Sequence, residues 1–178
     1  VNKLRRNMAV LTKSEIIKLI RQGKLKIVPF DYGQIGAGSI DLHLGKELLI
    51  FRKTKKIVDL EEGTNYKELG KKIEMGKEGI VIKPGQFVNG ITEEKVKLPK
   101  GYAARIEGRS RFARIGLLVH VSSGFIQPGT EGKIVLEIVN FSPNKIRLRP
   151  GVKICQIIIE EAKGKDAYAG RFYGQTTI

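Results

Sequence analysis

Two groups of residues between positions 107 and 140 have the types and spacing needed for chemistry. The first is a cluster of hydrogen-bond donors that follows a glycine, made of Gly108, Arg109, Ser110, Arg111 and Arg114. Guanidinium forks and a hydroxyl suit phosphate oxygens, and glycine lets the backbone come close to a ligand. The second is a lone carboxylate, Glu137, within an apolar run. Phosphate donors followed by an isolated acid indicate an enzyme that acts on a phosphorylated small molecule.

Glu137 lies in a segment, 133–139, whose composition predicts a β-strand. Its even-numbered side chains are isoleucine or leucine and point to one face, while Glu137 shares the other face with Val135. Since both faces carry apolar residues, we expect the strand to be covered on both sides. A carboxylate there must be paired, hydrogen-bonded or neutral, because an unpaired buried charge costs several kcal/mol. Two interpretations stay open: a group that transfers protons, or an ion pair with an arginine such as Arg105 or Arg114.

The donor cluster and the other candidate polar residue are not specific by themselves. The 108–114 segment also fits a solvated arginine patch, and it matches neither a P-loop nor a dinucleotide fingerprint. Gln156 sits among isoleucines in the run 152–159. An amide in such a place is more often a satisfied core residue than a ligand contact, although its paired donor and acceptor can read the edge of a base.

Metal-dependent and serine-triad chemistry find little support. The chain has only two histidines, His43 and His120, and one cysteine, Cys155. These do not easily furnish a three-ligand zinc site with an open position. The His-x-Glu and Pro-Cys-x-x-Cys pattern of zinc deaminases is absent, and neither histidine has a nucleophile elbow nearby. The sequence therefore predicts no protein-bound metal.

Composition and charge favour a one-domain globular protein. The 178 residues are 41% hydrophobic and 29% charged, and no apolar run is long enough to span a bilayer. One cysteine fits a reducing compartment, so we expect a cytoplasmic protein without membrane contact. The net charge of +15 suits nucleic acid, anionic lipid or charged small substrates. Because the lysines are scattered and no RNA-binding aromatic motif occurs, we expect no nucleic-acid partner.

The elements that must position these residues are mostly β. Thr12 and Glu15 form a capping-box pattern, which predicts a helix that ends at Gly23. Short apolar or alternating runs predict strands at 40–44, 48–51, 79–82, 87–91, 102–107, 116–121, 133–139, 145–149 and 152–159. Prolines and glycines between these runs predict tight turns. We therefore expect an all-β sandwich or barrel with a surface excursion at 61–78.

Taken in order, the motifs of the chain resemble those of the dCTP deaminase family, which shares its fold with the trimeric dUTPases. The resemblance covers nearly the whole chain from Met8. The segments that carry it are LTKSEIIKLIRQGKLKIVPF, GSIDLHLG, GRSRFARIGLLVH, IQPGTEGKIVLEIVN, RPGVKICQ and AYAGRFYGQ. One such motif is weak evidence, but their common order along the chain is specific.

The resemblance implies a distorted jelly-roll-like β-barrel, dUTPase-like, with a short N-terminal helix. It also implies a homotrimer with active sites between subunits. Residues 1–7 are expected to be a flexible extension, 8–178 one domain, and 168–178 a tail that closes over nucleotide. The implied reaction is zinc-independent hydrolytic deamination of dCTP to dUTP and ammonia. Magnesium would arrive with the triphosphate, since the sequence offers no dedicated carboxylate cage, and dTTP is a candidate effector.

Individual residues take roles from the same resemblance. Glu137 matches the catalytic glutamate, which takes a proton from water and passes one to the leaving amino group. Ser110 and Arg114 match donors that bind the triphosphate and help to hold the attacking water. The other expected substrate-binding residues are Arg109, Arg111, Gln127, Val135, Leu136, Gln156, Tyr168 and Gln175.

Two positions depart from the family pattern. Arg111 stands where a second serine is usual, which adds charge beside the phosphates. Gln127 stands where these deaminases and dUTPases usually carry aspartate. In dUTPases that aspartate activates the water that attacks the α-phosphate. Because an amide is no general base, we expect dUTP to be the end product. The alternatives are a dUTP diphosphatase or a bifunctional enzyme that forms dUMP, and a non-catalytic nucleotide-binding protein of this fold.

Overall fold

The computed structural model describes residues 9–55 and 57–178, and the predicted extension at 1–7 lies outside this part of the chain. Its elements, in chain order, are α1 (Lys13–Arg21), β1 (Lys26–Val28), the 3-10 helix η1 (Tyr32–Gln34), β2 (Ile40–Phe51), η2 (Tyr66–Leu69), β3 (Gly70–Glu74), β4 (Ile80–Ile82), β5 (Phe87–Lys97), β6 (Tyr102–Gly108), α2 (Ser110–Ala113), β7 (Leu117–Val119), β8 (Phe125–Ile126), β9 (Glu131–Asn140), β10 (Ile146–Leu148) and β11 (Lys153–Glu161). None of the described helices has the length and apolar character that a membrane crossing requires.

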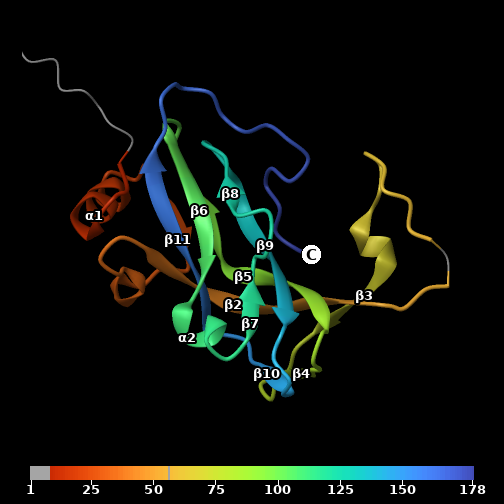
Figure 1. The fold of residues 1–178 in the computed structure, drawn as a ribbon. Coiled ribbons are helices and arrows are strands. Elements are labelled where there is room, and N and C mark those ends of the chain that lie inside the picture. Colours follow the sequence, from red (N-terminus) through yellow and green to blue (C-terminus); the bar gives the residue numbers. More distant parts are fainter. Residues whose placement is uncertain (1–8, 56) are drawn as a thin grey trace, which may run out of the picture.

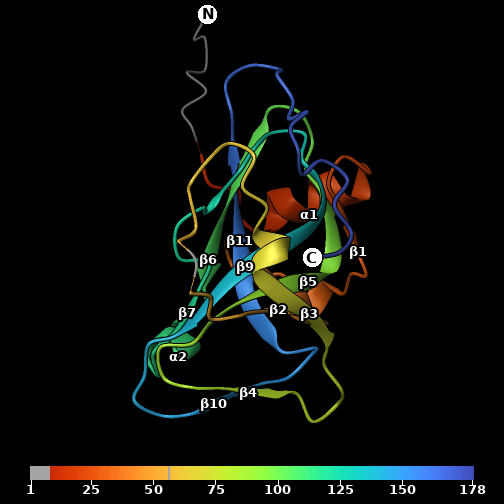
Figure 2. The same ribbon diagram turned by 90° about the vertical axis from the view of Figure 1, so that its right-hand side faces the viewer.

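The strands form one large antiparallel sheet that curls around the core. Its order is β7-β9-β5-β2-β11-β6-β8, with β1 paired to β5 and β3 paired to β2, while β4 and β10 form a separate two-stranded ribbon. Register shifts interrupt the β2–β5 and β5–β9 pairs, and such irregularities increase the local twist. In Figures 1 and 2, β6 and β11 cross β2 and β5 steeply, so the sheet wraps on itself. The predicted all-β fold with a short N-terminal helix is confirmed.

Alternation along the strands supplies the core. Leu42 of β2, Leu136 of β9 and Ile157 of β11 are each 0% exposed. Helix α1 packs Ile16 and Leu19 against the same cluster, and Figure 1 shows it beside β11. Full burial of such a side chain contributes about 1.5–3 kcal/mol to folding. The buried side chains on one face of these strands therefore hold the sheet in place. The side chains on the other face are available to form a site.

Helix α1 ends as its sequence predicts but begins differently. Thr12 is the residue before the helix, yet its side chain caps no backbone N–H, and the Glu15 carboxylate pairs with Lys18 at 3.3 Å. The predicted capping box is therefore wrong, because a lysine one turn along the helix takes the carboxylate. Gly23 has a φ of +65° and its N–H bonds to the Ile20 carbonyl at 2.9 Å, which closes the helix as expected.

Residues 61–78 are more than the surface excursion that their charge predicted. They contain η2 and β3, and β3 pairs with β2 from Glu47↔Glu74 to Phe51↔Gly70. Strand β3 is polar because it is largely exposed, with Lys71, Lys72 and Glu74 in solvent. The predicted strands 40–44 and 48–51 are also one continuous strand, β2, with a register shift where the prediction placed a break.

The C-terminal tail lies along β9 and ends beside β2. Gly132 has a φ of +148°, and a Cβ atom there would come within 2.8 Å of the Gln175 carbonyl oxygen. The missing side chain lets the tail approach closely enough for the Lys133 N–H to donate to that oxygen at 2.7 Å. Ile178 is 5% exposed, and its N–H donates to Glu47 at 3.2 Å. Figure 1 shows the tail, in dark blue, running back past β8 and β9.

Candidate active site

A cavity of about 850 Å³ opens on the face of β9 that carries Glu137. Strands β5 and β9, the segment after β7 and the tail all contribute to its wall. Much of the wall is aromatic, from Phe51, Tyr66, Phe87, Phe125, Tyr168 and Phe172. The volume lies within the range of roughly 300–1,000 Å³ that small-molecule sites occupy. Aromatic faces suit a planar ring, so the cavity can take a ligand of nucleotide size.

Glu137 is held in place by the segment that follows β7. His120 has a φ of +60°, and its N–H donates to the Glu137 carbonyl at 2.6 Å. Beyond this turn, Ser122 donates to the Glu137 carboxylate oxygen Oε2 through both its backbone N–H (3.2 Å) and its hydroxyl (3.1 Å). A left-handed conformation in a residue other than glycine costs energy and often marks a functional site. The other oxygen, Oε1, has no hydrogen-bond partner among the described residues.

The structure contradicts one expectation about Glu137 and one of the two interpretations that the sequence left open. Its face of β9 is not covered by a second layer, because Val135, Glu137 and Val139 are half-buried and line the cavity. Within the described part of the chain Glu137 also forms no ion pair, and Arg105 pairs with Glu160 instead. Valines that line a cavity for a ligand give the same sequence pattern as valines that pack on another layer. The pattern therefore could not distinguish the two.

Several of the residues predicted to bind substrate lie on the same cavity, namely Gln127, Val135, Tyr168 and Gln175. Gln127 is exposed and begins the predicted Pro128–Gly129 turn, in which its carbonyl accepts from the Thr130 hydroxyl at 2.8 Å. Leu136 points the other way into the core and is 0% exposed, so only its backbone is available to a ligand.

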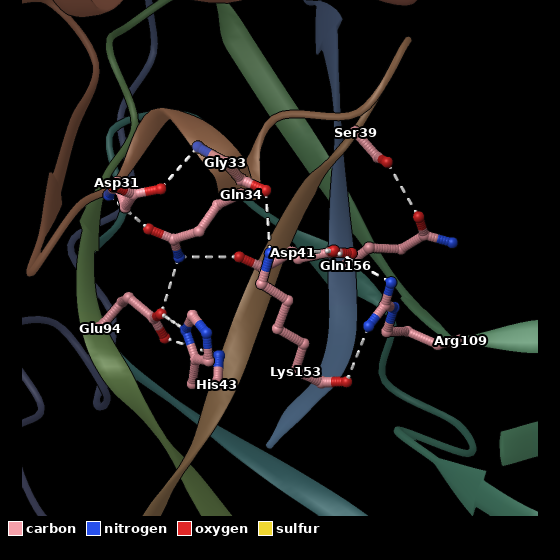
Figure 3. A network of polar contacts seen from close by, with 10 residues as sticks. All are labelled: Asp31, Gly33, Gln34, Ser39, Asp41, His43, Glu94, Arg109, Lys153 and Gln156. Atoms are coloured by element: carbon pink, nitrogen blue, oxygen red, sulfur yellow. Dashed lines mark hydrogen bonds and ion pairs between the residues drawn. The ribbon is translucent and has the colours of Figure 1, made fainter. Parts of the chain in front are cut away.

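The donor cluster lies away from this cavity. The Arg109 guanidinium pairs with Asp41 at 3.1 Å and donates to the Lys153 carbonyl at 3.3 Å, as Figure 3 shows. Arg109 is therefore tied to β2 and β11 rather than solvated. Ser110, Arg111 and Arg114 are exposed on or beside α2. One copy of the chain does not bring its phosphate donors together with Glu137.

Gln156 lies near Arg109 and not near Glu137. Its side chain on β11 accepts from the Ser39 hydroxyl at 2.8 Å (Figure 3). This contact agrees with the simpler interpretation of a satisfied amide, and it places Gln156 on the side of the sheet where the donor cluster lies.

A buried carboxylate supports the strand that carries Asp41. Glu94 is 1% exposed and accepts from Gln34 Nε2 (2.8 Å), the His43 N–H (2.9 Å) and His43 Nδ1 (2.5 Å). The same Gln34 amide donates to the Asp41 carbonyl at 2.9 Å (Figure 3). With three donors around it, Glu94 is satisfied and joins β5, β2 and η1. Burial, aided by the charges of Glu94 and Asp41, raises the pKa of the Cys155 thiol, which is unsuited to nucleophilic work.

Among the cavity residues that sequence reasoning missed are Asn89, Ser122 and Tyr66. An amide inside the apolar run 87–91 is the same kind of signal that singled out Glu137, so Asn89 could have been predicted from the sequence. Ser122 and Tyr66 carried no such signal, because both lie in polar segments. Within residues 9–55 and 57–178, no group of three or more His, Cys, Asp and Glu side chains could hold a metal ion.

A half-buried carboxylate in an aromatic cavity on a curled antiparallel sheet is the arrangement of a protein that binds a small planar molecule. A solved structure with this fold is the 2′-deoxycytidine 5′-triphosphate deaminase from Agrobacterium tumefaciens, with a TM-score of 0.69 and 24% identity. The match covers 88% of this chain and 49% of that one, so the chain spans about half the length of that structure. The family described as dCTP deaminase-like matches residues 10–162. The chain belongs to the dCTP deaminase-like family.

Curated relatives support the assignment over most of the chain. Proteins named "dCTP deaminase, dUMP-forming" are 38% identical over 168 residues in Sulfurihydrogenibium sp. and 35% identical over 168 residues in Persephonella marina. Each alignment covers 93% of this chain and 92% of the relative. The relative from Methanosphaera stadtmanae carries the same name and is 35% identical over 179 residues, or 95% of this chain and 91% of its own.

Proposed function

We propose that this protein deaminates dCTP without zinc and carries the product on to dUMP and pyrophosphate. The observation that carries deamination is Glu137, a carboxylate fixed through one oxygen at the wall of an aromatic cavity. The names of the relatives favour dUMP as the final product. This differs from the sequence-based expectation that the reaction stops at dUTP.

In the first step Glu137 acts as a proton carrier. Its free oxygen, Oε1, takes a proton from water as the water oxygen adds to C4 of cytosine. The same group then gives a proton to the amino nitrogen, the C4–N bond breaks and ammonia leaves. The proton that remains on the added hydroxyl passes to N3 of the ring as the C4 carbonyl forms. General acid–base transfer of this kind is typically worth 10²–10⁴ in rate. Ser122 keeps the carboxylate oriented because its donors hold Oε2 alone.

In the second step water attacks the α-phosphate of dUTP, and pyrophosphate leaves. Gln127 lies at the edge of the cavity, where the resemblance places the water-activating aspartate. Its amide can orient a water molecule through its carbonyl oxygen, but it cannot accept a proton at neutral pH. We therefore expect this step to be slower than deamination, with dUTP as an intermediate that accumulates before dUMP.

The site is completed, in this proposal, by a second copy of the chain in a homotrimer. One observation supports this: the 108–114 segment does not line the cavity that contains Glu137. Its Ser110, Arg111 and Arg114 are exposed and available to a neighbouring subunit. Closed symmetric assemblies of this type repeat the same contact around the axis, so each copy would complete its neighbour's site.

Magnesium is proposed to enter with the nucleotide, bound by the phosphates. Among the described residues that line the cavity, Glu137 is the one carboxylate, and its Oε2 already accepts a hydrogen bond from Ser122. Lys133 supplies a positive charge to the same wall. One carboxylate and a lysine do not make a cage for a metal ion. A chelator that spares magnesium should leave deamination unchanged, and restoration of a lost activity by zinc would contradict zinc independence.

The experiment that tests the proposal is product analysis over time. Purified protein is incubated with dCTP and magnesium, and ammonia, dUTP, dUMP and pyrophosphate are resolved. We expect ammonia and dUTP first, followed by dUMP with an equal amount of pyrophosphate. A reaction that stops at dUTP would contradict the second step. The absence of ammonia would contradict deamination and favour a nucleotide-binding protein.

A further inference from the structure

Asn89 is a buried polar residue in the cavity wall whose side-chain oxygen is unsatisfied. It lies on β5 directly opposite Glu137 on β9, so the two side chains share a face of the sheet. The residue is 7% exposed and lines the cavity. Its oxygen Oδ1 is buried and has no hydrogen-bond partner among the residues that the structure describes.

The one other buried side-chain atom in this condition, within the described part of the chain, is Nδ1 of His120, which lines the same cavity. The His120 ring contacts the Ser123 carbonyl through Nε2 at 2.7 Å. A carbonyl only accepts, so Nε2 carries the proton and Nδ1 of the neutral ring is an acceptor. Asn89 Oδ1 and His120 Nδ1 are thus two acceptors without donors. Asn89 lies beside Glu137 on β5, and His120 lies on the other side of Glu137, in the turn after β7.

Unsatisfied acceptors at one place indicate a ligand that brings hydrogen-bond donors. Buried polar groups are nearly always paired, and an unpaired one destabilises the fold. The amino group on C4 of cytosine carries two N–H donors, and uracil has a carbonyl oxygen at that position. That amino group is also the one that must come within reach of Glu137 for deamination.

We propose that Asn89 binds the exocyclic amino group of cytosine through Oδ1 and thereby selects cytosine over uracil nucleotides. This inference rests on the proposed function and deepens it by naming the residue that recognises the base. In this arrangement Oδ1 accepts from one amino hydrogen while Glu137, on the neighbouring strand, delivers a proton to the same nitrogen. A uracil carbonyl would face Oδ1 with a second acceptor, which weakens its binding.

Substitution of a residue that serves ligand binding should lower the melting temperature less than substitution of a residue that serves folding. Asn140, the matched control, is also buried, but its amide donates to the carbonyls of Ile82 (3.2 Å) and Asn144 (2.7 Å) and accepts from the Ser142 N–H (3.0 Å). Asn140→Leu should therefore lower the melting temperature. Asn89→Leu removes an unsatisfied oxygen at nearly constant volume, so its melting temperature should equal or exceed that of the parent.

The binding test uses Glu137→Gln as the parent, because this change prevents turnover during the measurement. The affinities of dCTP and dUTP are measured by calorimetry for Glu137→Gln alone and with Asn89→Leu or Asn89→Ala added. We expect dCTP to bind about 10- to 100-fold more weakly when the amide is removed. The affinity for dUTP should stay the same or rise, because the facing acceptor is removed, so the preference for cytosine disappears.

Three outcomes would overturn the proposal: unchanged dCTP affinity, an equal loss for both nucleotides, or a fall in melting temperature as large as that of Asn140→Leu. The smaller Asn89→Ala variant tests the same loss of binding if the leucine does not fit. A wild-type chain that binds dCTP in preference to dUTP but releases no ammonia would refute the proposed function alone, since the base preference would still be measured.

Discussion

Ser122 donates two hydrogen bonds to a single oxygen of Glu137. Its backbone N–H and its hydroxyl reach Oε2 at 3.2 and 3.1 Å. The carboxylate is thereby fixed through one oxygen, and Oε1 remains for chemistry. The backbone donor depends on the turn at His120, whereas the hydroxyl depends on the residue type, so substitution can separate the two.

Replacing Ser122 with alanine should therefore weaken catalysis without abolishing it. The hydroxyl bond to a charged group is lost while the N–H bond stays, and such bonds are typically worth about 1.5–3 kcal/mol. We expect kcat for deamination to fall by about 10-fold or more with KM changed little. Ser14→Ala, on the outside of α1, is the control. A Ser122→Ala enzyme with unchanged kcat would show that the hydroxyl has no part in the mechanism.

A second prediction concerns pH and the tail. Burial raises the pKa of Glu47, but hydrogen bonds from Lys72, Thr177 and the Ile178 N–H outweigh it and leave the pKa below its ordinary value of 4.5. A carboxyl whose folded pKa is lowered stabilises the docked tail fully above the ordinary pKa, and this stabilisation is lost as pH falls through the lowered value. Hydrogen exchange at Ile178 should therefore accelerate below about pH 4.5 relative to the core strands.

The control for the tail is Glu47→Gln, which removes the titrating group. Its tail should exchange faster at neutral pH and show little further change in acid. Exchange at Ile178 that is independent of pH in the wild-type protein, after correction for intrinsic rates, would show that Glu47 does not hold the tail.

The sequence predicted the strands better than it predicted the site. Period-two alternation and Pro–Gly turns identified most of the sheet because burial of one face leaves a regular pattern. Glu137 was found for the same reason, since a carboxylate breaks an apolar alternation. The two-residue β8 and the polar β3 carry too little pattern to detect, and β1 was also missed, whereas the equally short β4, β7 and β10 were predicted from their apolar residues.

The rest of the site depends on contacts between distant segments. No local sequence pattern predicts that His120 adopts a positive φ or that Ser122 donates a hydrogen bond to Glu137. The motif around Arg109 predicted donors for phosphate, but no local pattern predicts that in one chain Arg109 pairs with Asp41. Residues that meet across a subunit contact leave no periodic signal in the sequence of one chain.

A third prediction tests Gln127 in the second reaction. Gln127→Asp supplies a carboxylate that can accept a proton at the edge of the cavity, where the amide cannot. We expect the conversion of dUTP to dUMP to speed up by about 10²-fold, with the rate of ammonia release from dCTP changed less than about threefold. An unchanged rate of dUMP formation would show that another group activates the water.

A fourth prediction tests the shared site. Glu137→Gln and Arg114→Ala chains, each inactive alone, are co-expressed with different tags and purified as mixed assemblies. If Glu137 and Arg114 come from different copies, some sites combine two intact residues and about a quarter of wild-type activity should return at an equal chain ratio. Mixed assemblies that stay inactive, or a monomer in light scattering, would rule out the shared site.

The most direct measurement is the rate of ammonia release from saturating dCTP by Glu137→Gln compared with wild type. The change keeps the volume and the contact with Ser122 but removes the proton carrier. The proposed mechanism predicts a rate at least about 10²-fold lower, with dCTP still bound at an affinity close to that of the wild type. A Glu137→Gln protein that releases ammonia at nearly the wild-type rate would show that the chemistry occurs elsewhere.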